Sequence, residues 1–151
     1  MDRPNEPNES APPDQLAVEM KIALVMHADL DRGAVANRGA VLATGLAMRH
    51  PEIIGPDLAT QDGKVLFGFT KVPIVVLSAR EQSLVDLEAR AREKGLTTLV
   101  FLGRAQGMRS YEAYRESVAA SEAADLDIDA VLLYGPRKAV SQVTGSLPSL
   151  R

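Results

Sequence analysis

The polar side chains that could do chemistry gather directly after one apolar segment near the start of the chain. Residues 22–26 (IALVM) are apolar, and six candidates follow within twelve positions: His27, Asp29, Asp31, Arg32, Asn37 and Arg38. In proteins that alternate strands and helices, the residues just past a strand end lie at the rim of the sheet, where ligands bind. The segment therefore predicts a functional site after the first strand.

The pair His27 and Asp29 is the candidate for catalysis. A histidine beside a carboxylate can act as a general base that its neighbour holds in one tautomer. The same atoms can bind a divalent cation, but no HExxH or similar spacing supports this, so we expect neither a metal nor another cofactor. In the structural alternative, Asp29 caps the turn before a helix and His27 packs at the strand end.

Two further loops carry donors after predicted strands. Residues 103–107 (GRAQG) offer Arg104 and Gln106 between glycines, without the GxxxxGK[ST] pattern of a P-loop. Residues 135–138 (GPRK) place two cations at a helix N-terminus, which opposes the helix dipole unless an anion lies between them. Both loops can equally be ordinary connections with solvated side chains.

If the loops after the first, third and fourth core strands face one crevice, they form a mostly basic site. We expect it to bind a small anionic ligand, such as a carboxylate, phosphate or nucleotide. An enzyme here would use acid/base chemistry through His27 and Asp29, since no Ser–His–Asp pattern is evident. The ligand-binding candidates are Arg32, Asn37, Arg38, Arg104, Gln106, Gly135, Arg137 and Lys138.

Composition limits the classes of protein. The chain of 151 residues suits one domain, and the 46% apolar share allows a sizeable core. A formal net charge of −3 disfavours a protein whose main task is to bind nucleic acid, and the absence of cysteine excludes disulfides and thiolate catalysis. No apolar run approaches the roughly 20 residues of a membrane helix, so we expect a cytoplasmic protein without membrane contact.

The hydrophobic pattern predicts alternating strands and helices. Residues 1–20, with four prolines, predict a disordered tail before a single domain over 21–151. Apolar runs predict core strands at 21–26, 71–77, 97–102 and 130–134, with an edge strand, Lys64–Phe67, after an Asp62-Gly63 hairpin turn. Helices are expected over 34–50, from a Ser78–Glu81 capping box, from Ser110, and over 138–143.

These elements predict an α/β domain with a mixed, mostly parallel sheet of about four strands and helices on both faces. The acidic residues 125–129 are expected to be solvated. The edge strand offers a place where two copies could pair.

Three segments resemble, in chain order, the type II peptidyl-tRNA hydrolase fold. Residues 21–30 (KIALVMHADL) resemble its first strand and Asp-bearing turn, and 71–106 its strand–helix–strand unit with a glycine-arginine-x-glutamine loop. Residues 131–147 (VLLYGPRKAVSQVTGSL) resemble its closing strand, Gly-Pro turn and Val-Thr-Gly helix end. The chain is more similar still to a bacterial family of unknown function that shares this fold and keeps the HADLDRG…AN and GPRKAV…TGSLP patterns.

The resemblance implies a peptidyl-tRNA or related ester as substrate and tRNA as a partner, but the hydrolytic residues depart from it. The hydrolases carry a lysine early in the first helix, where residues 34–39 (AVANRG) have none. They place an acidic residue before the third loop and a threonine inside it, where this chain has Phe101 and Ala105. Insertions at 51–70 and 107–128 could cover the crevice.

Three functions therefore remain open from the sequence. The chain is a ligand-binding protein or enzyme that uses the crevice, a residual hydrolase of peptidyl-tRNA or related esters, or a non-catalytic domain that dimerises near Lys64–Phe67. A basic surface leading to the site would favour the hydrolase, because binding of tRNA depends on contacts with its phosphates.

Overall fold

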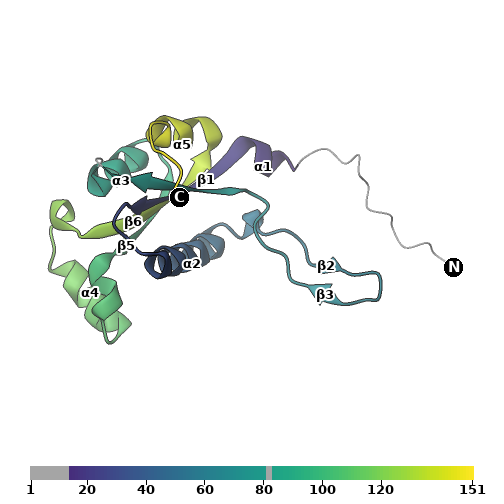
Figure 1. Ribbon diagram of the computed structural model, residues 1–151, viewed down its shortest axis with the longest axis horizontal. Helices are drawn as coiled ribbons and strands as arrows, with labels where there is room; N and C mark the ends of the chain where they lie inside the picture. Colours follow the sequence, from purple (N-terminus) through teal and green to yellow (C-terminus); the bar gives the residue numbers. More distant parts are fainter. Residues whose placement is uncertain (1–13, 81–82) are drawn as a thin grey trace.

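A four-stranded sheet lies at the centre of the computed structural model, which describes residues 14–80 and 83–151 (Figure 1). Its strands are β1 (Met20–His27), β4 (Ile74–Ala79), β5 (Thr97–Leu102) and β6 (Ile128–Pro136), in the order β4-β1-β6-β5. The mixed sheet of four strands is thus confirmed. Strands β1, β4 and β5 run in one direction, as expected of a mostly parallel sheet, but β6 lies between β1 and β5 and runs antiparallel to both, so only the β1–β4 pairing is parallel.

The connection from β5 to β6 explains this direction. It contains η2 (Gly103–Gly107), α4 (Tyr111–Ala119) and η3 (Ala123–Asp125). The backbone N–H of Gly103, just after β5, donates to the carbonyl of Asp127, just before β6, at 2.8 Å. The chain therefore re-enters the sheet at the edge where it left, and β6 must run back.

Helices cover both faces of the sheet, as the sequence predicts (Figure 1). Helix α2 (Arg32–Arg49) packs on one face, and α3 (Leu84–Glu93) and α5 (Arg137–Thr144) pack on the other. The alternation of side chains along β1 builds both layers: Ile22, Leu24 and Met26 point towards α2, whereas Ala23 and Val25 point towards α3 and α5.

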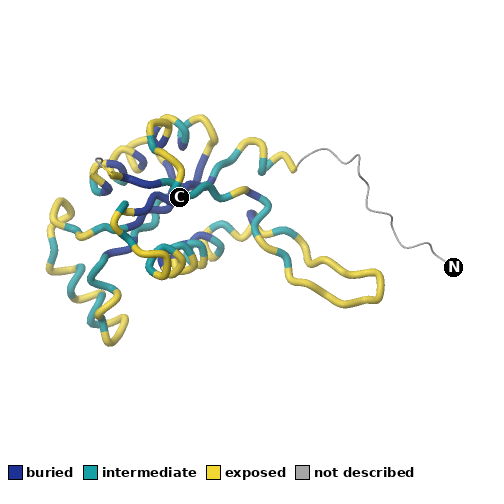
Figure 2. The backbone as a smooth tube through the Cα atoms, in the orientation of Figure 1, coloured by how far each residue is buried: buried dark blue, intermediate teal, exposed yellow. Residues whose placement is uncertain are grey.

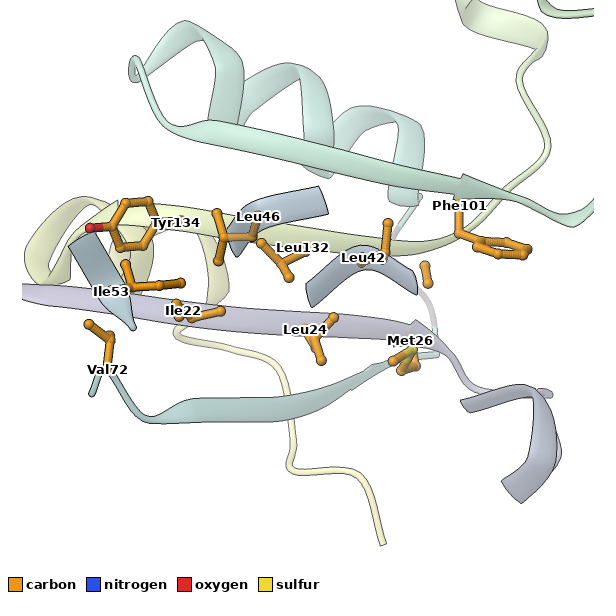
Figure 3. Packing of buried hydrophobic residues seen from close by; sticks show 11 residues of the cluster. Ile22, Leu24, Met26, Leu42, Leu46, Ile53, Val72, Phe101, Leu132 and Tyr134 are labelled. Atoms are coloured by element: carbon orange, nitrogen blue, oxygen red, sulfur yellow. The ribbon is translucent and has the colours of Figure 1, made fainter. Parts of the chain in front are cut away.

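Helix α2 lies close to the sheet. Figure 3 shows its Leu42 and Leu46 among the side chains of β1 and β6. A Cβ on Gly45 would lie 2.6 Å from Leu99 Cδ2, so the absence of a side chain there permits the close approach to β5. Among residues 14–80 and 83–151, no helix has the length and apolar character needed to cross a membrane.

The caps of two helices test the sequence reasoning. Ser110 caps α4 as predicted, because its Oγ accepts a hydrogen bond from the Ala113 N–H at 3.1 Å. The capping box at Ser78 is wrong: Ser78 is buried in β4 and pairs with Met26, while Ser83 caps α3. Glu81 lies outside the described residues. Strand pairing with the end of β1 outweighs the local capping signal here.

The segment before β1 is helical where a disordered tail was predicted over residues 1–20. Helix α1 spans Gln15–Glu19, and β1 begins at Met20; residues 1–13 lie outside the described residues. Asp14 caps α1 and forms an ion pair with Lys71 at 3.2 Å. Arg137 donates to two backbone carbonyls of α1 at 2.9 Å, and this contact from the far end of the chain is invisible to local composition.

Residues 54–70 form an exposed arm. Its strands, β2 (Leu58–Ala59) and β3 (Val65–Leu66), pair antiparallel around a turn in which Gly63 has φ +89°, so the predicted hairpin is confirmed. Figures 1 and 2 show the arm extending from the body with its tip fully exposed. It follows η1 (Pro51–Ile53) at the C-terminal end of α2, so the insertion at 51–70, which could have covered the crevice, does not reach the rim after β1.

Candidate functional site

The direction of β6 separates the predicted site residues into two groups. Strands β1, β4 and β5 end at one edge of the sheet, where β6 begins. Because Pro136 pairs with Met20 at the start of β1, the loop after β6 lies at the opposite edge. The predicted single crevice is therefore wrong for Gly135, Arg137 and Lys138: Gly135 is buried in β6, Arg137 holds α1, and Lys138 is exposed.

At the end of β1, the proposed catalytic pair is open to solvent. The side chains of His27 and Asp29 are 48% and 92% exposed, and Nδ1 of His27 lies 3.9 Å from the Asp29 carboxylate. The same Nδ1 accepts a hydrogen bond from the Asp29 N–H at 3.2 Å, which closes the turn. Asp31, rather than Asp29, caps α2 by accepting from the Ala34 N–H at 2.8 Å, and Arg32 is exposed beside it.

The guanidinium of Arg38 is the centre of the polar contacts at this edge. Its side chain is only 4% exposed, and its Nη2 donates to Asp129 Oδ2 at 3.0 Å and to Gln106 Oε1 at 2.9 Å. Its Nη1 donates to Asn37 Oδ1 at 3.4 Å, and its Cζ lies 4.3 Å from the centre of the Phe101 ring. Three predicted binding residues, Asn37, Arg38 and Gln106, are thus brought together.

Asp129 is a functional candidate that the sequence reasoning missed, because residues 125–129 were expected to be solvated. Asp127, two positions earlier, forms an ion pair with Arg104 at 2.6 Å. The spacing of Asp127 and Asp129 could have indicated this. Residues two positions apart at the start of a strand share one face, so both carboxylates are turned towards the arginines. A Cβ on Gly103 would lie 3.4 Å from Asp129 Oδ2 and 3.5 Å from Asp127 Oδ2, so the two ion pairs are neighbours.

Arg104 is fixed by this ion pair and by the helix that follows. Its Nη1 donates to the hydroxyls of Ser117 at 3.1 Å and Ser121 at 2.6 Å. Partial burial alone would raise the pKa of the Asp127 carboxyl, but hydrogen bonds from the Arg104 backbone N–H and guanidinium outweigh it and lower the pKa. Arg104 therefore ties η2, α4 and the start of β6 together.

A pocket of about 640 Å³ opens beside the Arg38 guanidinium, and we call it the Arg38 pocket. It is lined by Asp31, Gly33, Ala34, Asn37, Arg38, Val41, Phe101, Ala105 and Gln106. A second depression of about 370 Å³ adjoins it through Val41, Phe101 and Ala105, and adds Met108, Arg109, Tyr111 and Tyr114. The predicted insertion at 107–128 thus contributes part of this wall, whereas neither His27 nor Asp29 lines either space.

The contacts of Arg38 orient two amide groups at the pocket. The side-chain oxygens of Asn37 and Gln106 both accept from the guanidinium. Their NH₂ groups are therefore turned away from Arg38 and can donate to a ligand. This arrangement offers fixed donors to carboxylate, phosphate or carbonyl oxygens.

A second polar cluster joins the end of α2 to the start of β5, at the opposite edge of the sheet. His50 contacts the Glu52 carboxylate through Nδ1 at 3.0 Å and the Thr97 hydroxyl through Nε2 at 2.9 Å, and its ring lies 4.6 Å from that of Tyr134. The pKa of the Glu52 carboxyl is lowered by hydrogen bonds from the backbone N–H of Glu52 and from the His50 side chain. A carboxylate, an imidazole and a hydroxyl in this order can activate a nucleophile. In this chain the three groups connect the C-terminal end of α2 to the start of β5.

Within residues 14–80 and 83–151, no group of three or more histidine or acidic side chains could hold a metal ion. A larger depression, of about 710 Å³, lies between α3, β5 and η3 and is lined mainly by apolar groups, among them Val85, Val100 and Leu126. Its charged lining residues are Glu88, Arg92 and Glu93, and the Arg92 guanidinium is already paired with Glu88 at 2.6 Å and is 73% exposed, in contrast to the buried Arg38.

Comparison with known proteins supports the fold and gives the family. A search of curated proteins found no match. A solved structure of a protein of unknown function from Agrobacterium tumefaciens strain C58 is similar, with a TM-score of 0.81 and 23% identity over 88% of this chain and 98% of that one. At this identity the likeness shows a shared fold. A family model described as a protein of unknown function, DUF2000, matches residues 20–151, and the chain therefore belongs to the DUF2000 family.

Proposed function

We propose that this chain binds a small molecule whose carboxylate, phosphate or carbonyl oxygens lie against the Arg38 pocket. One observation carries the proposal: a guanidinium only 4% exposed that holds the amide groups of Asn37 and Gln106 at the pocket wall. Burial of a charged pair carries a desolvation cost of several kcal/mol, which the attraction between the charges and their hydrogen bonds must offset. Apolar residues of similar volume often stabilise a fold equally well. The retained charge thus supports a role in positioning ligand contacts.

The charge balance narrows the ligand. Asp129 neutralises Arg38 and Asp127 neutralises Arg104, so the basic crevice expected from the sequence is not formed by these arginines. The donors that remain are neutral amides, joined by Arg109, which lines the adjoining depression and forms none of the ion pairs found in the described part of the chain. We infer a ligand with one acceptor group and a flat apolar part.

The apolar part would lie along the second depression. Met108, Tyr111 and Tyr114 supply a polarisable side chain and two aromatic rings there. Aromatic rings bind flat apolar groups through their faces and edges, at low cost in conformational entropy. An aromatic carboxylate or the ester of a small acid fits the Arg38 pocket and the second depression together. A nucleotide whose base lies on the rings of Tyr111 and Tyr114 is the larger candidate.

Residues 101 and 105 favour binding over hydrolysis at this pocket. The resemblance to the hydrolases places an acidic residue and a threonine at these positions, whereas here Phe101 and Ala105 form apolar wall. A catalytic role for His27 and Asp29 would need a ligand that reaches from the pocket to the exposed end of β1. We therefore propose binding as the function and treat hydrolysis as an outcome of the test.

A thermal-shift screen of the full chain tests the proposal. The panel contains aromatic carboxylates, phosphorylated metabolites, nucleotides and short RNAs, and a ligand at 100 times its Kd should add about 2.7 kcal/mol of stability. The shift should fall in the Gln106→Ala and Asn37→Ala variants. It should persist in Lys138→Ala, an exposed residue at the opposite edge of the sheet.

Each outcome of the screen is informative. A shift that Gln106→Ala abolishes supports the Arg38 pocket and gives the ligand class. A shift with RNA that only His27→Ala abolishes would instead favour the hydrolase hypothesis. A flat screen with folded protein would contradict ligand binding of these classes.

A further inference from the structure

The exposed arm carries an unusual number of large apolar side chains. Phe67 is 85% exposed and Phe69 is 76% exposed, with Leu58, Val65 and Leu66 between 47% and 57%. Figure 2 shows exposure along the tip of the arm on both strands. Scattered apolar residues on a surface need no explanation, but a cluster on one projecting element marks an interaction site.

The arm is also too small to hold itself together. Its two strands pair over only two residues each, Leu58–Ala59 with Val65–Leu66. An isolated two-stranded hairpin is marginally stable in water and needs packing against another layer. Only its base is anchored, where Ile53 and Val72 on either side of the arm are buried in the core.

The outward side of α2 is a second uncovered apolar surface, and the arm follows directly from its C-terminal end. Residues 39–48 (GAVLATGLAM) carry no charge over ten positions. Val41 is 49% exposed and Met48 is 81% exposed, and Ala40 and Thr44 on the same helix are also exposed. A solvated helix face normally carries charged or polar residues, so a partner is expected here too.

We propose that the arm and the outward side of α2 form the interface of a homodimer, in which the arm of each copy packs on α2 of the other. Each chain presents both a projecting apolar arm and an uncharged, largely apolar helix face, so the arm of each copy can contact α2 of the other, as a two-fold symmetric contact requires. This proposal does not rest on ligand binding at the Arg38 pocket, and the two surfaces meet at Val41, which also lines that pocket.

The area available matches a stable dimer. A phenylalanine can bury roughly 150–250 Å², so the four phenylalanines of two arms would supply on the order of 600 Å² of the ~1,600 Å² in a standard interface. The remaining apolar side chains of the arm and α2 can supply most of the rest. Aromatic residues at the centre of an interface are also those that contribute most to affinity.

Other occupants within the chain fit less well. The sequence of residues 1–13 (MDRPNEPNESAPP) has no large apolar side chain besides Met1 with which to cover the arm. The C-terminal segment is not free to cover the arm, because it already pairs with the outer edge of β4. Ser78 N–H donates to the Pro148 carbonyl, and Leu150 N–H donates to the Val76 carbonyl. A second copy is therefore the occupant that we infer.

Sedimentation of the full chain at increasing concentration tests the interface. We expect a dimer that dissociates on dilution, and at least about a tenfold weaker dimer in the Phe67→Ser/Phe69→Ser variant. Val18→Ser removes an apolar side chain that is 48% exposed on α1 and should leave the dimer unchanged. A monomer at all concentrations, or a dimer that the arm variant leaves intact, overturns the proposal.

A crosslinking experiment covers the case in which the arm variant does not fold. The chain contains no cysteine, so single cysteines give an unambiguous result. A mixture of Leu66→Cys and Thr44→Cys chains should oxidise to a disulfide-linked heterodimer in preference to either homodimer. A mixture of Leu66→Cys with Arg90→Cys, on the exposed side of α3, should not. Equal crosslinking in both mixtures would contradict the proposed contact.

Discussion

Removal of the Asp129 carboxylate is the most demanding test of the arrangement around Arg38. The Arg38 side chain is 4% exposed in the parent chain, and in an Asp129→Ala variant its guanidinium would keep only the neutral oxygens of Asn37 and Gln106 as acceptors. Loss of one partner of a buried ion pair costs roughly 3–5 kcal/mol, a large fraction of the ~5–15 kcal/mol stability of a domain. We therefore expect the melting temperature to fall by about 6–20 °C.

The same reasoning predicts recovery in a double variant. Arg38→Met/Asp129→Leu removes both charges and keeps an apolar contact with Phe101, so its stability should return to within about 2 kcal/mol of the parent chain. Urea unfolding followed by circular dichroism measures the free energy of unfolding of the single and the double variant, with an unchanged m-value as the check on two-state behaviour. The exposed pair Glu112–Arg115 is the control, and Arg115→Ala should have little effect. A loss in Asp129→Ala no larger than in this control would refute the reasoning.

Three further predictions concern the Asp127 ion pair, the cap of α3 and the arm. Hydrogen bonds hold the pKa of Asp127 below its ordinary value of 3.8, so this carboxylate stabilises the fold above that pH and its contribution disappears as the pH falls through the folded-state pKa. Asp127→Asn should flatten the dependence of melting temperature on pH below about 4, and superimposable curves would contradict this. Ser83→Ala should cost about 1 kcal/mol in urea unfolding through loss of the α3 cap; no loss would mean that Ser83 is not the cap. Gly68→Ala places a Cβ against the Gly55 carbonyl and should raise proteolysis of the arm without loss of the core.

The sequence predicts elements well where apolar runs are long and continuous. Strand β5 matches its predicted range at both ends, and β1 extends its predicted range by one residue at each end. The Ser110 cap was also correct, because its signal is local. The Ser78 capping box was wrong because a buried strand, paired with β1, used the same residue.

The site was only half predictable for a different reason. Arg38, Asn37 and Gln106 were identified because they follow strand ends, where ligands bind. The partner of Arg38 lies 91 positions away, and its carboxylate is meaningful only once β6 is known to begin at that edge. Strand direction depends on tertiary packing rather than on residue pattern, so the sequence also misplaced Arg137 and Lys138. The same packing explains α1, which is held by Arg137.

The central claim is that the Arg38 pocket, and not the end of β1, is the ligand site. Nuclear magnetic resonance of the ¹⁵N-labelled full chain tests it most directly, with benzoate and a purine nucleotide as probes. We predict saturable shifts of the side-chain amide signals of Asn37 and Gln106 and of the backbone over residues 103–108, and loss of these shifts in Gln106→Ala. Saturable shifts confined to His27 and Asp29, or to the Arg137–Lys138 edge, would contradict the account.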